Sequence, residues 1–161
     1  MSIMKDSRVG AYGAIGIGLL MGLKIITLVE LAKIDWLSTI YALISAHALS
    51  RLTATTIILT DEYARENEDS KAKPVAKKMS MNAFLQAAFW GMTPLSIWCF
   101  FEKNALLLGV FIPLILLKIY LSRYFKRWIN GYTGDCLGAT QQLAEVVCYV
   151  FFLAILRYHG F

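Results

Sequence analysis

Five long apolar blocks, separated by shorter polar stretches, dominate the pattern along the chain. They run over Ala11–Ala32, Trp36–Leu59, Met81–Phe101, Ala105–Tyr120 and Cys136–Leu156. Each block approaches or exceeds the roughly 18–20 residues that a helix needs to cross a bilayer. A soluble helical bundle, the alternative, would carry polar residues at every third or fourth position throughout, and most of these blocks do not. We therefore predict an all-α, polytopic membrane protein of about five transmembrane helices, with residues 1–161 forming one membrane domain.

The composition supports this fold class. The 161 residues are 58% hydrophobic and 17% charged, whereas soluble domains carry about a quarter charged residues. The segment before Ala11 has no apolar core of its own, so we expect the first helix to remain in the mature protein rather than to be cleaved as a signal peptide. The three cysteines, Cys99, Cys136 and Cys148, show no CxxC spacing, and we expect apolar packing rather than a disulfide or a zinc site.

The positive charges predict the orientation. Of the 16 Lys and Arg, ten fall on the side of the N-terminus and of the polar loops 60–80 and 123–133, three on the other side, and three within the spans. The positive-inside rule then places the N-terminus in the cytoplasm, and we expect a multi-pass protein of the bacterial inner membrane. The net charge of +5 follows from these loops. No nucleic-acid-binding motif accompanies it, so we expect no nucleic-acid partner.

Polar residues at helical spacing mark the last block. Asp135, Gly138, Gln142 and Glu145 follow one another at steps of three, four and three, so they share one face of a helix. Glu145 lies about 15 Å deeper than Asp135 at 1.5 Å per residue. Ionisable groups at such depth mark function or a buried pair by default.

Arg51 in the second block lies at a similar depth, because it precedes the predicted end of that helix at Asp61 by ten residues. We predict that Arg51 and Glu145 face the same interior and pair, either as an ion pair that fixes helix register or as ligand contacts. His47 lies one turn before Arg51 on the same face. Lys24 and Glu30 in the first block are expected to pair or to extend toward the membrane surface.

Two helix starts share their chemistry. The segments "KDSRVGAYG" and "GYTGDCLGA" each combine a carboxylate, a hydroxyl, glycines and a tyrosine. Helix N-termini favour anions such as phosphate, and the carboxylates Asp6 and Asp135 favour a hard cation such as Mg²⁺. The alternative for each start is ordinary capping by Ser7, Thr133 or Asp135.

The motifs "IMKDSRVGAYG", "SR" in the second block, "YAR" after it and "TGDCLGATQQLAE" occur here in the order of the cobalamin synthase family. The whole chain resembles that family, whose members are membrane-bound adenosylcobinamide-GDP ribazoletransferases. The resemblance implies a Mg²⁺-dependent step of vitamin B12 biosynthesis. In it, α-ribazole or its 5′-phosphate attacks the phosphate of adenosylcobinamide-GDP, and GMP leaves.

The resemblance also implies site residues. Catalytic roles fall to Asp135, Arg8 and Arg51, and metal binding to Asp135 and Asp6. Arg8 and Arg65 would meet the phosphates, while Asp135 would orient the metal or the attacking hydroxyl. The substrate-binding positions that match the family motifs are Asp6, Ser7, Gly10, Tyr63, Arg65, Gly134, Gly138 and Glu145.

One feature departs from the family pattern. Family members carry a further membrane portion before the first of these motifs, with an Asp-rich "DGxAD" stretch that nothing in this chain matches. The chain therefore resembles the C-terminal part of a cobalamin synthase, a truncated or split enzyme that requires either the missing half or a second copy of itself.

Two other functional classes stay open at this point. One is a lipid-synthesising enzyme like the CDP-alcohol phosphotransferases, which uses similar phosphate chemistry. The other is a small oligomeric membrane protein or transporter without enzymatic activity, in which Lys24, Arg51 and Glu145 would line a path. Transporters of this kind often show repeat symmetry and spans broken by glycine or proline, and the three prolines of this chain argue against that class.

Overall fold

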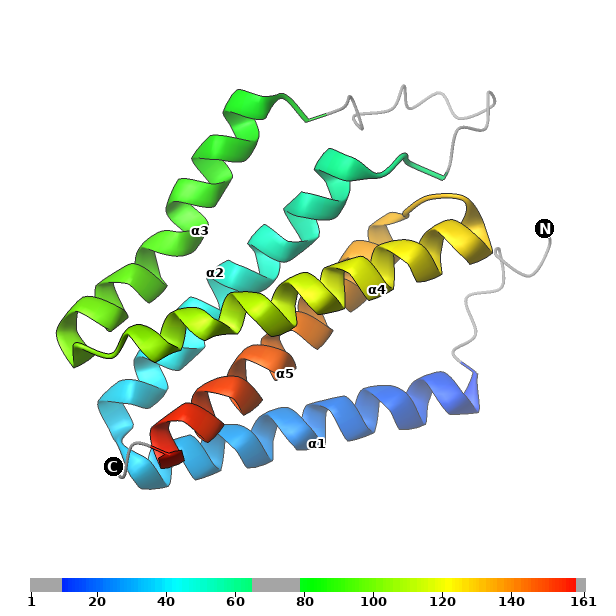
Figure 1. Ribbon diagram of the computed structural model, residues 1–161. Coiled ribbons are helices and arrows are strands. Elements are labelled where there is room, and N and C mark those ends of the chain that lie inside the picture. Colours follow the sequence, from blue (N-terminus) through cyan, green and yellow to red (C-terminus); the bar gives the residue numbers. More distant parts are fainter. Residues whose placement is uncertain (1–9, 65–78, 159–161) are drawn as a thin grey trace.

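The computed structural model describes residues 10–64 and 79–158, and they form a bundle of long helices (Figure 1). The elements are α1 (Ala11–Ile34), α2 (Trp36–Thr60), α3 (Met81–Glu102), the 3₁₀ helix η2 (Ala105–Val110), α4 (Phe111–Ile129) and α5 (Gly134–Tyr158). Five segments, with η2 and α4 counted as one, are long and apolar enough to cross a membrane. The predicted all-α fold with five spans is confirmed.

Side-chain caps define where two of these helices begin. The carboxylate of Asp35 accepts a hydrogen bond from the Ser38 backbone N–H at 2.6 Å and so starts α2. This hydrogen bond lowers the pKa of Asp35, because it favours the charged carboxylate. The Ser80 hydroxyl accepts from the Ala83 N–H at 3.2 Å at the start of α3. Such caps satisfy backbone donors that the first turn leaves unpaired.

The fourth helix is longer than the apolar block predicted. The block ends at Tyr120, and residues 123–133 were expected to form a loop, but α4 continues to Ile129. Leu121 and Phe125 are buried one turn apart while the charged residues between and after them are exposed. The last two turns are therefore amphipathic, and the packing of their apolar face stabilises the helix. Their many charged residues are the reason that the sequence predicted a loop.

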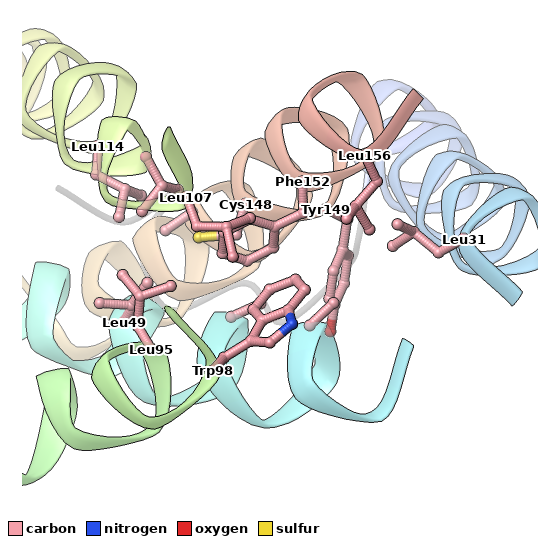
Figure 2. Close-up of a cluster of buried hydrophobic side chains, with 14 residues drawn as sticks. Leu31, Leu49, Leu95, Trp98, Leu107, Leu114, Cys148, Tyr149, Phe152 and Leu156 are labelled. Atoms are coloured by element: carbon pink, nitrogen blue, oxygen red, sulfur yellow. The ribbon is translucent and has the colours of Figure 1, made fainter. Parts of the chain in front are cut away.

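Helix α5 lies at the centre of the bundle and packs against α1, α2, α4 and η2. The main core forms where α2, α3 and α5 meet (Figure 2). Trp98 of α3 and Phe152 of α5 are fully buried there, with ring centroids 4.9 Å apart in an edge-to-face arrangement. Such aromatic pairs bury large areas and add about 0.5–1.5 kcal/mol beyond that burial.

Helix α1 joins the bundle through its C-terminal half. Its first nine residues, 11–19, are all exposed, and its buried positions are Lys24, Thr27 and Leu31, spaced by three and four. Figure 1 shows α1 close to α5 at the C-terminal end of α1 and diverging from it toward the N-terminal end of α1. The N-terminal half of α1 therefore has no partner among the described residues.

A tight backbone contact joins the segment after α2 to the turn between α4 and α5. The Tyr132 N–H donates to the Glu62 carbonyl at 3.0 Å, and the Ala64 N–H donates to the Tyr132 carbonyl at 2.9 Å. Gly131 lies beside this contact with a φ of +155°, and an added Cβ would lie 2.3 Å from the Glu62 carbonyl oxygen. Only glycine fits this approach. The contact fixes the end of α2 next to the start of α5.

Candidate functional site

A continuous set of polar contacts crosses the bundle between α1, α2 and α5, with Glu145 at its centre. One carboxylate oxygen accepts from Lys24 Nζ at 2.5 Å. The other lies 3.4 Å from the Ser50 hydroxyl and 3.3 Å from His47 Nδ1. Three helices thus contribute a charged or polar group to one carboxylate. We call Lys24, His47, Arg51, Gln142 and Glu145 the polar cluster.

Lys24 makes a second contact within this cluster. Its ammonium also donates to Gln142 Oε1 at 2.6 Å. The Lys24 and Glu145 side chains are only 11% and 13% exposed. Because Lys24 meets both Gln142 and Glu145, these two residues lie on one face of α5, as the three-residue spacing predicted. Lys24 is also the first buried residue of α1, so the polar cluster is where that helix joins the bundle.

The predicted direct pair between Arg51 and Glu145 is wrong. Arg51 Nε donates instead to His47 Nε2 at 3.0 Å, and Lys24 occupies the carboxylate. Arginine has no acceptor, so His47 Nε2 must be unprotonated and its proton must lie on Nδ1, which faces Glu145. Arg51 therefore reaches Glu145 through the His47 ring. Lys24 and Arg51 both lie near the depth of Glu145. Because α1 packs on α5, Lys24 is the cation that contacts the carboxylate.

The polar cluster carries an excess positive charge. Lys24 and Arg51 contribute two cations, Glu145 contributes one anion, and His47 is neutral in this arrangement. Glu145 lies eleven residues into α5, about 16 Å along the helix. The edge of the cluster is open, because Arg51 is exposed and His47 is 60% exposed. Charged groups at such depth face a protein interior or a water-filled cavity rather than lipid. The cluster therefore has the chemistry to receive an anion.

The start of α5 provides a second open surface. Gly134, Asp135 and Gly138 are exposed, and an added Cβ at either glycine would meet no atom within 4 Å. Thr133 precedes the helix, and its hydroxyl oxygen accepts from the Cys136 backbone nitrogen at 3.5 Å, which agrees with the alternative of ordinary capping by Thr133. Asp135 stands in the first turn, where the helix dipole favours its negative charge. Backbone and carboxylate are both accessible there.

Tyr63 lies beside this start. Its ring meets Tyr132 edge-on, with centroids 5.5 Å apart. Burial and the neighbouring Tyr63 and Asp61 raise the pKa of the Tyr132 hydroxyl. The structure therefore brings the segment after α2 next to the glycine-rich turn before α5. Gly10 precedes α1 as an exposed residue with an extended backbone.

The metal site cannot be assembled from the described residues. In residues 10–64 and 79–158, no three His, Cys, Asp or Glu side chains lie close enough to hold an ion. Asp135 provides one accessible carboxylate. The predicted residues Asp6, Ser7, Arg8 and Arg65 lie outside the described residues.

A separate ion cluster lies near the C-terminal end of α1. Glu30 pairs with Arg157 of α5 at 2.5 Å and with Lys33 at 2.6 Å. The expected pairing of Lys24 with Glu30 is therefore wrong, because α5 supplies each of them with a nearer partner. The signals for Lys24, His47 and Gln142 were present in the sequence as polar residues within apolar blocks, but the predicted site did not include them.

Comparison with known proteins identifies the relatives of this chain. The model of the cobalamin-5-phosphate synthase family matches residues 1–153. An adenosylcobinamide-GDP ribazoletransferase from Shewanella frigidimarina is 40% identical over 155 residues, which is 96% of this chain and 58% of that protein. Enzymes of the same name from Shewanella piezotolerans and Shewanella woodyi are 41% and 42% identical, over 96% and 95% of this chain and 58% of each enzyme. No solved structure gives a significant match.

The chain thus spans less than two thirds of the length of these curated relatives. The family match covers the first four apolar blocks, the fifth block as far as residue 153, and every motif on which the resemblance rested. This chain belongs to the cobalamin-5-phosphate synthase family.

Proposed function

We propose that this chain is part of an adenosylcobinamide-GDP ribazoletransferase that acts in cobalamin biosynthesis. In the proposed reaction, a hydroxyl of α-ribazole or of its 5′-phosphate attacks the phosphate attached to adenosylcobinamide. A new phosphate ester forms, the pyrophosphate bond breaks, and GMP leaves. The family match supports this reaction over a lipid phosphotransferase or a transporter, since the relatives carry the name of this enzyme.

The observation that carries the proposal is the excess positive charge of the polar cluster on its open edge. Attack on a pyrophosphate concentrates negative charge on phosphate oxygens, and fixed cations stabilise that charge. Arg51 would contact the pyrophosphate, because it is exposed and its contact with His47 uses only Nε. Glu145 would act on Arg51 through His47 and so would position it.

The start of α5 would hold the ribazole substrate. Asp135 lies about 15 Å from Glu145 along α5, so it would bind this substrate near the membrane surface and not at the phosphate that Arg51 contacts. The open backbone at Gly134 and Gly138 allows a large substrate to approach. Arg8 and Arg65 would meet further phosphate oxygens, with Asp6, Ser7, Gly10 and Tyr63 at the substrate's edge. Mg²⁺ would take Asp135 and Asp6 among its ligands, and bound there it would neutralise phosphate charge.

A partner is part of this proposal. The relatives are longer than this chain, and the exposed edge at His47 and Arg51 needs a protein or water-filled surrounding within a membrane. The portion of the relatives that this chain does not match would cover the exposed edge at His47 and Arg51, and a second copy of the chain is the alternative. The proposed location is the bacterial inner membrane, with the N-terminus in the cytoplasm.

The test is reconstitution. The purified chain is assayed for adenosylcobalamin formation from adenosylcobinamide-GDP and α-ribazole with Mg²⁺, both alone and with the remaining portion of a relative supplied separately. Arg51→Gln should lower the rate about 10- to 100-fold, as expected for a lost hydrogen bond to a charged group. Arg127→Gln, an exposed change in the last turn of α4, is the matched control. Absence of product in every arrangement, together with absence of binding of either substrate, would refute the reaction.

A further inference from the structure

A groove separate from the polar cluster lies between α2, α3 and α4. Both α3 and α4 pack on α2, but among the described residues they approach each other only through η2. Figure 1 shows α3 and α4 diverging from that end toward the start of α3. The resulting cavity has a volume of about 320 Å³, and Leu52, Phe84 and Ile115 line it from the three helices. Apolar side chains form most of its walls.

One end of this groove is polar. Thr56, Thr60 and Lys118 line it there, and Lys118 Nζ donates to the Thr60 hydroxyl at 2.8 Å. No carboxylate lies within 4 Å of this ammonium in the part of the chain that the structure describes. The nearby Asp61 accepts from the Ser122 hydroxyl at 2.6 Å. Lys118 is thus a cation bound to a neutral group at the level where α2 ends, on the predicted cytoplasmic side.

The lining of the groove indicates what it can hold. Its walls are mostly apolar along α2, α3 and α4, and its polar end carries Lys118, so it suits a molecule with a hydrocarbon chain and an anionic end. Basic pockets between transmembrane helices on the cytoplasmic side bind anionic lipid head groups.

We propose that this groove binds one anionic glycerophospholipid. An acyl chain would lie along Leu52, Phe84 and Ile115, and the phosphate would accept hydrogen bonds from Lys118 and Thr60. Charge complementarity selects an anionic head group, because Lys118 has no carboxylate partner among the described residues. This inference does not depend on the proposed reaction, since the polar cluster lies between α1, α2 and α5.

The test measures lipid binding to the full chain by native mass spectrometry. Phosphatidylglycerol and phosphatidylcholine with identical acyl chains are titrated into the detergent-solubilised protein, and soluble glycerophosphoglycerol serves as the head group alone. The wild type should bind phosphatidylglycerol about fivefold more tightly than phosphatidylcholine, as expected for one lysine near the membrane surface. The head group alone should not bind measurably. Equal affinities for the two lipids in the wild type would overturn the proposal.

Three variants separate the parts of the proposal. Lys118→Gln should abolish the preference, Lys118→Arg should keep it, and Lys126→Gln should leave it unchanged, because Lys126 is an exposed cation of α4 outside the groove. Thr56→Phe should fill the groove and weaken binding of both lipids by tenfold or more. Circular dichroism confirms that each variant is folded. An unchanged preference in Lys118→Gln or unchanged binding in Thr56→Phe overturns the proposal. So does a dimer in the wild-type mass spectrum that Thr56→Phe removes, because that result would make a second copy of the chain the occupant.

Discussion

The contact between Lys24 and Glu145 gives the sharpest test of the structure. Replacing Lys24 with Met keeps the length and the apolar stem of the side chain but removes the ammonium. Glu145 then keeps only Ser50 and His47 as partners, at 3.4 Å and 3.3 Å, and Gln142 loses its donor. The change leaves a carboxylate that is only 13% exposed without its direct cation.

The expected cost follows from burial. Both side chains of the pair are nearly nine-tenths buried, and removing one partner of a buried ion pair costs about 3–5 kcal/mol. Because His47 and Ser50 still contact the carboxylate, we expect the lower end, about 3 kcal/mol, which is roughly a 150-fold change in the unfolding equilibrium. Replacing both residues with Met removes the two charges together, so the double variant should be within about 1 kcal/mol of the wild type.

The assay is reversible unfolding in mixed micelles at increasing fractions of sodium dodecyl sulfate, followed by circular dichroism. Lys33→Met is the matched control on the same helix, since Lys33 pairs with Glu30 but is 65% exposed, and exposed pairs contribute at most about 1 kcal/mol. The reasoning is refuted if the two lysine variants lose equal stability, or if the losses of the single variants Lys24→Met and Glu145→Met simply add in the double variant.

Three further changes, one of them with a matched control, test other parts of the fold by the same unfolding measurement. Gly131→Ala should cost about 1–3 kcal/mol through its positive φ and backbone clash, whereas Gly134→Ala, in open space, should cost less than about 1 kcal/mol. Asp35→Ala should cost about 1 kcal/mol by removing the cap on Ser38. Folding lowers the pKa of Asp35, so its contribution to stability is present above the unfolded pKa of about 3.9 and is lost as the pH falls through the folded pKa. If Asp35→Ala leaves the dependence of stability on pH unchanged, this reasoning is wrong. Trp98→Ala should cost about 3–5 kcal/mol, and a loss below 1 kcal/mol would place Trp98 outside the core.

The sequence predicted the number and order of the spans because each apolar block approaches the thickness of a bilayer. It also predicted that Gln142 and Glu145 share a face, because helical spacing alone determines that. It did not predict the end of α4. The closely spaced charges at Arg123, Lys126 and Arg127 are typical of a loop, and the sequence did not show that they lie on the exposed face of a helix. Periodicity of the buried Leu121 and Phe125 was the signal that could have extended the helix.

The sequence could not show whether Lys24 or Arg51 is the partner of Glu145, for a physical reason. Counting residues gives the depth along a helix axis, and both cations lie within a few ångströms of the depth of Glu145. Depth does not specify which helices are neighbours or which way each one rotates. That information comes from the packing of α1 on α5, which places Lys24 beside the carboxylate and leaves Arg51 to the His47 ring.

The separation of Lys24 from Glu145 along the chain has a consequence for biosynthesis. The two residues are 121 positions apart, and ribosomes add about 5–20 residues per second. Lys24 is therefore synthesised roughly 6–24 seconds before its carboxylate partner. During that interval the first helices reach the membrane with a cation that has yet to meet its counter-charge. Synthesis of α5 is the event that allows α1 to pack against the bundle, so a ribosome stalled before residue 145 would leave α1 exposed to membrane quality-control proteases.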